Sequence, residues 1–160
     1  MNKKDLSFII ALIGLMIAAT SFFYPWYSLN ITLEVPDTPP IVVKLVVGAN
    51  SIEAMSGNPE IDTLLDSLDL KGEYAKYAFF FILALALIGI LRRKFLRTGI
   101  GLVMYVLGVY ILLYLYPSFA PSLSSGGEIT ILAVVEILKG GYLLMTGGIV
   151  MVIAGLVAAG

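Results

Sequence analysis

Four stretches of this 160-residue chain are apolar, free of charge, and long enough, or nearly so, to cross a lipid bilayer. A hydrocarbon core of about 30 Å needs about 20 apolar residues in a helix. The second stretch is short and needs Tyr74 and Ala75 to complete it. We expect an α-helical membrane protein, a bundle of four transmembrane helices, with spans at residues 6–24, 77–91, 98–116 and 140–160.

The basic residues predict which side of the membrane each connection faces. Two lysines precede the first span, and four basic residues fill the short turn 92–97, whereas ten of the eleven acids lie on the opposite side. Loops rich in lysine and arginine stay in the cytoplasm. We therefore expect a multi-pass plasma-membrane protein with both termini cytoplasmic. The residues that set this topology are Lys3, Lys4, Arg92, Arg93, Lys94 and Arg97.

Tryptophan and tyrosine flank the spans on the predicted outer side. Both residue types prefer the membrane–water interface, and we interpret eight of them as interface anchors. These are Tyr24, Trp26, Tyr27, Tyr74, Tyr77, Tyr114, Tyr116 and Tyr142. The first span also has the pattern of a signal peptide, which we expect to remain attached as an anchor, so that residues 1–24 form the N-terminus and first span.

The connection 25–76 is expected to form a small extracellular β-rich domain. Residues 27–35 alternate strictly between apolar and polar, which is typical of a half-buried strand. Residues 41–47 are a second β-branched run, and the proline-rich stretch between the two runs favours a hairpin. Residues 48–57 fit either a short strand or a helical turn.

A short amphipathic helix is predicted over residues 59–71. Asn58 is suited to cap it, Pro59 suits its first position, and apolar residues recur at helical spacing. One face of this helix carries four carboxylates, a weak candidate cation site for which a solvated helix face is the favoured interpretation, because no ion-wrapping loop accompanies them. The four are Asp62, Asp66, Asp69 and Glu73.

The second outer segment, 117–139, leaves three interpretations open. Its first part is loop-like, and its second part is apolar but contains Glu136 and Lys139. Residues 129–135 are predicted either to add a strand to the hairpin's sheet or to extend the fourth helix, with the two charges paired one turn apart. A charged pair inside the bilayer is the least favoured interpretation, because it is costly.

Small residues at regular spacing predict where the helices pack. Gly141, Gly148 and Gly155 recur every seven residues, and Gly14 and Ala18 form a small pair four apart. In lipid, helices associate by close contact at such residues. Packing within the bundle is the simpler interpretation, and a subunit interface is the alternative.

The residue types present exclude most site chemistry. The chain has no Cys and no His, which removes thiol and imidazole catalysis and most zinc sites, and none of the four spans carries a charge for an ion path. We expect no enzyme activity, no cofactor and no metal. A net charge of −1 argues against nucleic acid. The absence of Cys and Gln points to a thermophile, and Asn30 opens an N-glycosylation pattern, in a strand that lies close to the membrane.

The layout resembles that of claudin-type tetraspan proteins. The matching pieces are Trp26 after the first span, the strands 27–35 and 41–47, the helix 59–70 and the segment 129–135. The resemblance implies a first outer segment built as a sheet, and a role in lateral assembly or contact at the cell surface. The two cysteines of the claudin signature are absent from this chain.

We therefore expect a non-enzymatic structural or interaction protein whose outer β-rich domain mediates self-assembly or cell-surface contact. Unpaired sheet edges are natural places for strand addition. The alternatives are an accessory subunit that stabilises a larger membrane complex, and an oligomeric channel or transporter. The expected partners are membrane lipid and either further copies of the chain or another membrane protein.

Overall fold

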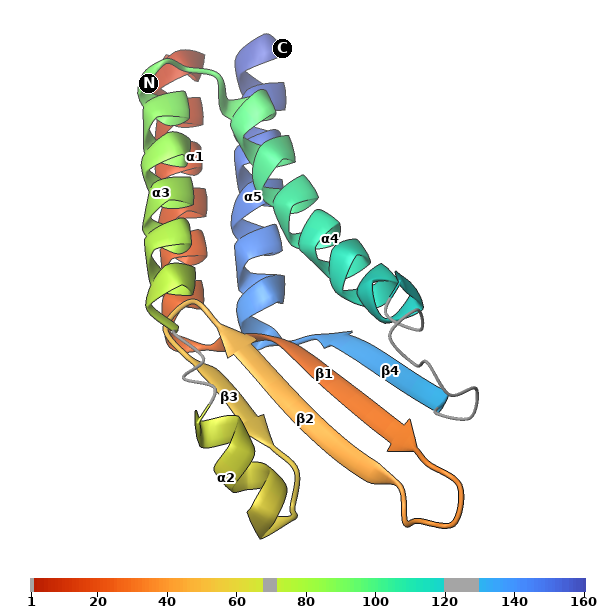
Figure 1. Cartoon of the computed structure of the whole chain (residues 1–160). Coiled ribbons are helices and arrows are strands. Elements are labelled where there is room, and N and C mark those ends of the chain that lie inside the picture. The colour runs from red at the N-terminus through yellow and green to blue at the C-terminus, as the bar shows by residue number, and fades with distance from the viewer. Residues whose placement is uncertain (1, 68–71, 120–129) are drawn as a thin grey trace.

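The computed structural model describes residues 2–67, 72–119 and 130–160 of the chain. Four long helices stand side by side, and a sheet with one short helix lies beyond one end of them (Figure 1). In chain order the elements are α1 (Lys3–Thr20), the 3-10 turn η1 (Ser21–Phe23), β1 (Pro25–Glu34), β2 (Ile41–Gly48), β3 (Ile52–Met55), α2 (Pro59–Ser67), α3 (Gly72–Leu91), α4 (Phe95–Phe119), β4 (Thr130–Ile137) and α5 (Lys139–Ala159).

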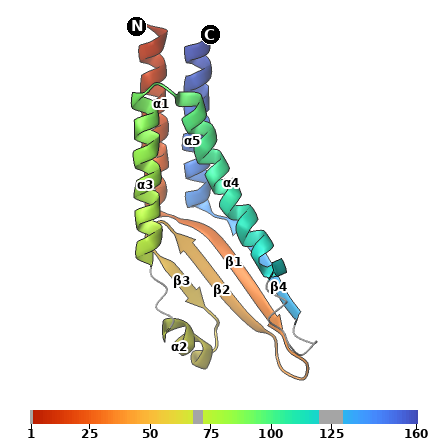
Figure 2. The same ribbon diagram turned by 45° about the horizontal axis from the view of Figure 1, so that its top comes forward.

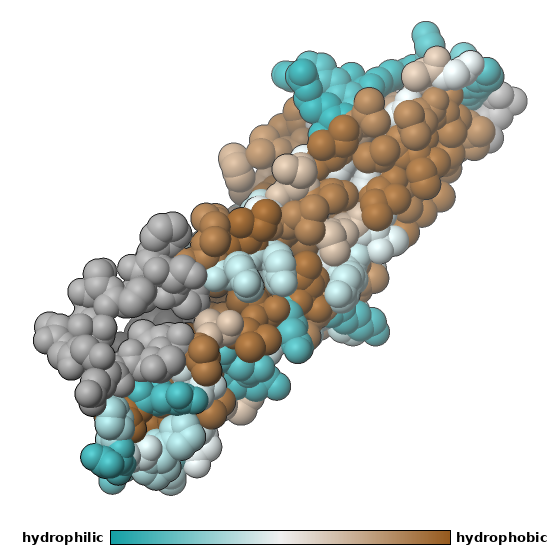
Figure 3. All heavy atoms as spheres, turned by 90° about the vertical axis from the view of Figure 1, so that its right-hand side faces the viewer, coloured by the Kyte–Doolittle hydropathy of each residue, from teal (hydrophilic) through white to brown (hydrophobic). Residues whose placement is uncertain are grey.

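The helices α1, α3, α4 and α5 are each long and apolar enough to cross a membrane. Apolar residues cover the middle of the bundle, and hydrophilic residues gather at its ends (Figure 3). The four predicted spans are thus confirmed as helices, with wider bounds than expected for the second and third. Helix α3 already begins at Gly72 and so includes Tyr74 and Ala75, and α4 runs from Phe95 to Phe119.

Both termini and the basic turn between α3 and α4 lie at the same end of the bundle, opposite the sheet (Figures 1 and 2). The Nζ of Lys3 donates a hydrogen bond of 2.8 Å to the backbone oxygen of Gly160, which joins the two ends of the chain. The turn contains Arg93 at a φ of 56°, the left-handed conformation that ends α3. Six of the ten basic residues of the sequence therefore lie at the end of the bundle away from the sheet.

The sheet has four antiparallel strands in the order β3-β2-β1-β4. The predicted hairpin is confirmed as β1 and β2, and the ambiguous stretch after it contains the short strand β3. Residues 130–137 form a strand that pairs with β1, with Leu29 opposite both Leu45 and Val135. The extra-strand interpretation is correct and the helical alternative is wrong, because β1 offers a free edge to this β-branched segment.

Helix α5 is central in the bundle because glycines allow two neighbours to approach it closely. A Cβ built on Gly147 would lie 2.8 Å from the Ala18 Cβ of α1, and one on Gly148 would lie 2.8 Å from the Gly99 oxygen of α4. Adjacent helical residues point about 100° apart, since 3.6 residues make a turn. The two glycines therefore face two different helices.

Candidate interaction surface

The predicted packing residues are used inside the chain. Gly14 faces Gly147 across the contact of α1 with α5, and Ala18 is fully buried there. Gly148 and Gly155 lie against α4, where a Cβ on Gly155 would be 2.7 Å from that of Leu96. Gly141 faces the start of β1, 3.1 Å from the Trp26 oxygen by the same construction. The three glycines of α5 spaced seven residues apart, Gly141, Gly148 and Gly155, therefore pack against α4 and β1 of the same chain rather than being open to another subunit.

Trp26 fixes the sheet to the helix bundle through buried contacts. Its side chain is 5% exposed, and its Nε1 donates a hydrogen bond of 2.8 Å to the Ser21 oxygen. The indole lies edge-on to Phe79 of α3, with ring centroids 5.4 Å apart, and also edge-on to Tyr105 of α4. The expectation that Trp26 anchors the chain at the lipid interface is wrong, because α3 and α4 cover it.

Tyr27 makes the second connection between the sheet and the helices. It is 2% exposed, and its hydroxyl donates a hydrogen bond of 2.8 Å to the backbone oxygen of Val106 in α4. Burial raises the pKa of this hydroxyl far above its ordinary value. Tyr27 is therefore also a core residue, contrary to the interface prediction. The alternation of β1 places Tyr27 on the apolar face of the sheet, and α4 covers the part of that face nearest the helices.

Five of the other predicted anchors are exposed, as an interface position requires. The Lys139 Nζ lies 4.2 Å from the ring centroid of Tyr24, a cation–π contact at the start of α5. The Tyr116 side chain falls outside the described part of the chain. Contact with lipid stays a prediction for the five exposed anchors, which are Tyr24, Tyr74, Tyr77, Tyr114 and Tyr142.

The start of α5 fits closely against the start of β1. The amide of Leu138 donates a hydrogen bond of 2.6 Å to the Trp26 oxygen. A Cβ on Gly140 would lie 2.6 Å from the Tyr24 oxygen, so only glycine fits there without displacing backbone. Gly140 thus allows the sheet to pack closely against the bundle. The only sign of this role in the sequence is that Gly140 directly precedes Gly141, the first of the three glycines spaced seven residues apart.

The two faces of the sheet differ in polarity. One face carries Tyr27, Leu29, Ile31 and Leu33 of β1 together with apolar partners from β2 and β4. This face is buried by α4 where the sheet meets the helices, and it is half-buried at the end of the sheet away from them. The other face presents polar β1 residues, of which Asn30 lies between Lys44 and Val134 in mid-sheet and is partly buried. Glycosylation of Asn30 stays a prediction.

Strand β4 forms one edge of the sheet. Its inner side pairs with β1 along eight residues, and within the described ranges no strand pairs with its outer side. Leu132 and Val134 are 52% and 57% exposed, and Glu136 is the single charge of the strand. Soluble edge strands are usually protected by charges, prolines or bulges. An eight-residue apolar edge with one carboxylate is little protected and offers a surface for strand pairing.

The carboxylates of the weak cation site have local partners or are spread out. Asp62 Oδ1 accepts hydrogen bonds from the Ser56 amide at 2.7 Å and from its hydroxyl at 2.8 Å, and Asn58 caps α2 by accepting from the Glu60 amide. Among the residues that the structure describes, no three carboxylates are grouped so as to hold a metal. Asp69 lies outside those residues, and Asp66 and Glu73 are exposed.

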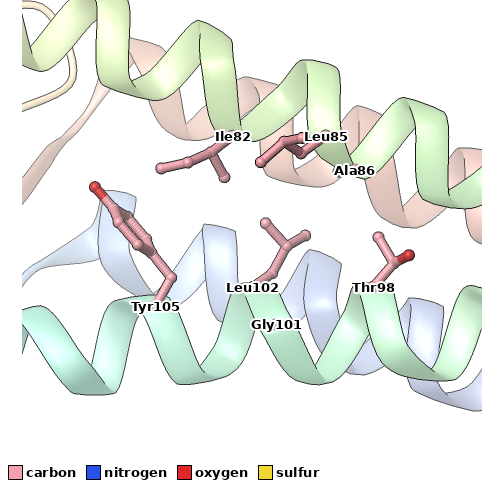
Figure 4. Close-up of a pocket in the computed structure, with 7 residues that line it drawn as sticks. All are labelled: Ile82, Leu85, Ala86, Thr98, Gly101, Leu102 and Tyr105. Atoms are coloured by element: carbon pink, nitrogen blue, oxygen red, sulfur yellow. The ribbon is translucent and has the colours of Figure 1, made fainter.

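An apolar groove of about 270 Å³ opens between α3 and α4 (Figure 4). Ile82 and Leu85 face Leu102 and Tyr105 across it, and Gly101 leaves space because a Cβ there would meet nothing within 4 Å. The Thr98 hydroxyl at one end donates to the Lys94 oxygen at 2.9 Å. The lining has no charged group, so the groove offers no ligand for an ion or a proton relay.

No protein-family model matches this chain, and no curated protein sequence matches it. The geometry of the chain itself is therefore the basis for a functional proposal.

Proposed function

We propose that the protein is a non-enzymatic structural component of the plasma membrane that assembles laterally with copies of itself through the β4 edge. The helices anchor the chain, both termini and the basic turn lie in the cytoplasm, and the sheet stands on the outer side. Support for this orientation comes from six of the ten basic residues, the two lysines near the N-terminus and the four of the turn, which lie together at the end opposite the sheet.

The observation that carries the proposal is the edge of β4, with which no strand in the described part of the chain pairs on the outer side, together with the exposure of Leu132 and Val134 in this strand. An unpaired strand holds a row of free backbone donors and acceptors, which gives affinity when a second strand is added. The edge is held firmly, because Trp26 and Tyr27 fix the neighbouring strand β1 to the helices. A rigid edge does not have to be ordered on binding, so it loses little conformational entropy.

The resemblance to claudin-type proteins supports the same role. The chain shares with them a sheet built largely from the first long connection, a short helix before the second span, and an added strand from the second connection. It differs in having no cysteine, so the bridge between two strands that belongs to the claudin signature is absent here, and backbone pairing holds the strands of the sheet together.

Lysine substitution on the edge tests the proposal. We expect Val134→Lys to convert the assembled protein in detergent into monomers, because a lysine charge on an edge strand disfavours the addition of another strand. The control is Leu64→Lys, an exposed apolar residue of α2 at 64% exposure, which leaves the assembly unchanged. Light scattering after size-exclusion chromatography gives the mass, and circular dichroism shows that both variants are folded. A monomeric wild-type protein, or an assembled Val134→Lys variant, refutes the proposal.

A further inference from the structure

A basic crevice lies at the end of the bundle that carries both termini. Arg93, Lys94 and Arg97 line a space of about 390 Å³ where α4 begins. Leu96 of α4 and Gly155 and Ala158 of α5 form the apolar part of its wall. The crevice is therefore bounded by two membrane-crossing helices and by the turn that leads into one of them.

The charge of the crevice has no nearby compensation along the chain. The sequence contains no Asp or Glu from residue 74 to residue 127, which covers α3, α4 and the turn between them. Asp5 is the one acid among the residues that precede the first span. Arg93, Lys94 and Arg97 are all exposed to solvent. A ligand of this crevice is therefore expected to carry negative charge.

The floor of the crevice is apolar and closed. A Cβ built on Gly155 would lie 2.7 Å from the Cβ of Leu96, so α4 and α5 touch directly beneath the basic residues. Leu96 is nevertheless 43% exposed, which continues the apolar wall onto the outer surface of the bundle. A ligand that matches both parts has an anionic group joined to an apolar chain.

We propose that this crevice binds an anionic phospholipid of the cytoplasmic leaflet. Arg93, Lys94 and Arg97 hold the phosphate of the headgroup, and the acyl chains run from Leu96 along the surface of the helices. Basic pockets between transmembrane helices on the cytoplasmic side are suited to anionic headgroups. Orientation of a membrane protein needs only positive charge near the spans, whereas a binding site needs the charges to line one cavity, as these three do.

Binding of phosphatidylglycerol to the purified full-length protein tests the proposal. Delipidated protein in a non-ionic detergent is titrated with phosphatidylglycerol, and bound lipid is counted by native mass spectrometry. The test variant is Lys94→Gln with Arg97→Gln. Its matched control is Lys4→Gln with Arg92→Gln, which removes two charges at the same end of the bundle but outside the crevice. Circular dichroism checks that both variants are folded.

We expect one tightly bound phosphatidylglycerol per chain, weaker binding of phosphatidylcholine, and no displacement by inorganic phosphate. Each basic side chain at an anionic membrane surface contributes about a factor of five in affinity. The test variant is therefore expected to bind about 25-fold more weakly, and the control to bind as the wild type does. Equal losses in the two variants, equal binding of both lipids, or displacement by phosphate would each overturn the proposal.

Discussion

The hydroxyl of Tyr27 and the backbone oxygen of Val106 form a hydrogen bond of 2.8 Å between residues 79 positions apart in the chain. It joins the first strand of the sheet to the middle of α4, in a place that water does not reach. Together with the Trp26 contacts, this bond fixes the sheet to the helices.

Removing that hydrogen bond is expected to destabilise the protein. Tyr27→Phe keeps the ring in place and deletes the donor, so we expect a loss of about 1 kcal/mol in the free energy of unfolding. Thermal or denaturant unfolding in detergent measures the loss. Tyr114→Phe, which changes a side chain 60% exposed, should leave the stability unchanged. Equal stability of Tyr27→Phe and the wild type would show that the bond contributes nothing.

The same hydroxyl predicts a pH dependence in the alkaline range. Because burial raises the pKa of Tyr27 in the folded state, the unfolded chain releases this proton first, at a pH of about 10. The contribution to stability is complete below that pH and is lost as the pH rises above it. We expect the unfolding midpoint of the wild type to fall more steeply above about pH 10 than that of Tyr27→Phe. Parallel curves for the two proteins would contradict the prediction.

The close contact of α1 with α5 predicts a position that accepts only glycine. Gly147→Ala would place its methyl group 2.8 Å from the Ala18 Cβ, and we expect the overpacking to cost about 1–3 kcal/mol. Gly108→Ala is the control, because a Cβ there meets nothing within 4 Å, and it should be neutral or slightly stabilising. Thermal unfolding of the two variants measures the difference in stability, and similar unfolding midpoints would argue against close packing of Gly147 on α1.

A designed disulfide tests the register of the added strand. Thr32 and Leu132 are directly opposite each other in β1 and β4, and the chain has no native cysteine to interfere. Opposite Cα atoms lie about 4.5–5.5 Å apart, a separation that a disulfide can bridge. We expect Thr32→Cys with Leu132→Cys to form an intramolecular disulfide under mild oxidation, seen in the mass spectrum as the loss of the two thiol hydrogen atoms. The control pair Thr32→Cys with Val135→Cys, on opposite faces, should stay reduced, and its oxidation instead would mean a shifted register.

Selective labelling tests the orientation in the membrane. We expect a membrane-impermeant maleimide to label Thr38→Cys, in the turn between β1 and β2, on intact cells. Lys94→Cys, in the basic turn, should react only after the cells are permeabilised. The reverse pattern would place the sheet in the cytoplasm and would remove the basis of both functional proposals.

The four long apolar helices were predictable from the sequence, because a long uncharged apolar stretch has few other stable structures. The strand β4 was less so, since the segment from Ile129 to Val135 is equally apolar as a strand or as a helix, and the free edge of β1 decided between them. Trp26 and Tyr27 were misjudged for a related reason. A residue next to a span has the same local pattern whether it faces lipid or a core, and the contacts that bury Tyr27 come from α4, far along the chain.

The candidate surface follows from pairing that sequence alone does not specify. The alternation of β1 indicates which residues share a face, but it does not indicate which strand ends the sheet. The outer side of β4 is an edge only because β4 pairs with β1 on its inner side and no described strand follows it. The glycine spacing of α5 similarly predicts a close contact without naming α1 and α4 as the partners.

At the two described connections between sheet and helices, the chain has no hinge. β1 follows α1 after one short turn, β4 passes into α5 within two residues, and the Leu138 amide bonds the two connections together through the Trp26 oxygen. Leaning of the helices is therefore transmitted to the sheet as an equal rotation. Helices lean further in a thin bilayer than in a thick one, so in the proposed lateral assembly membrane thickness would set the angle at which neighbouring molecules meet.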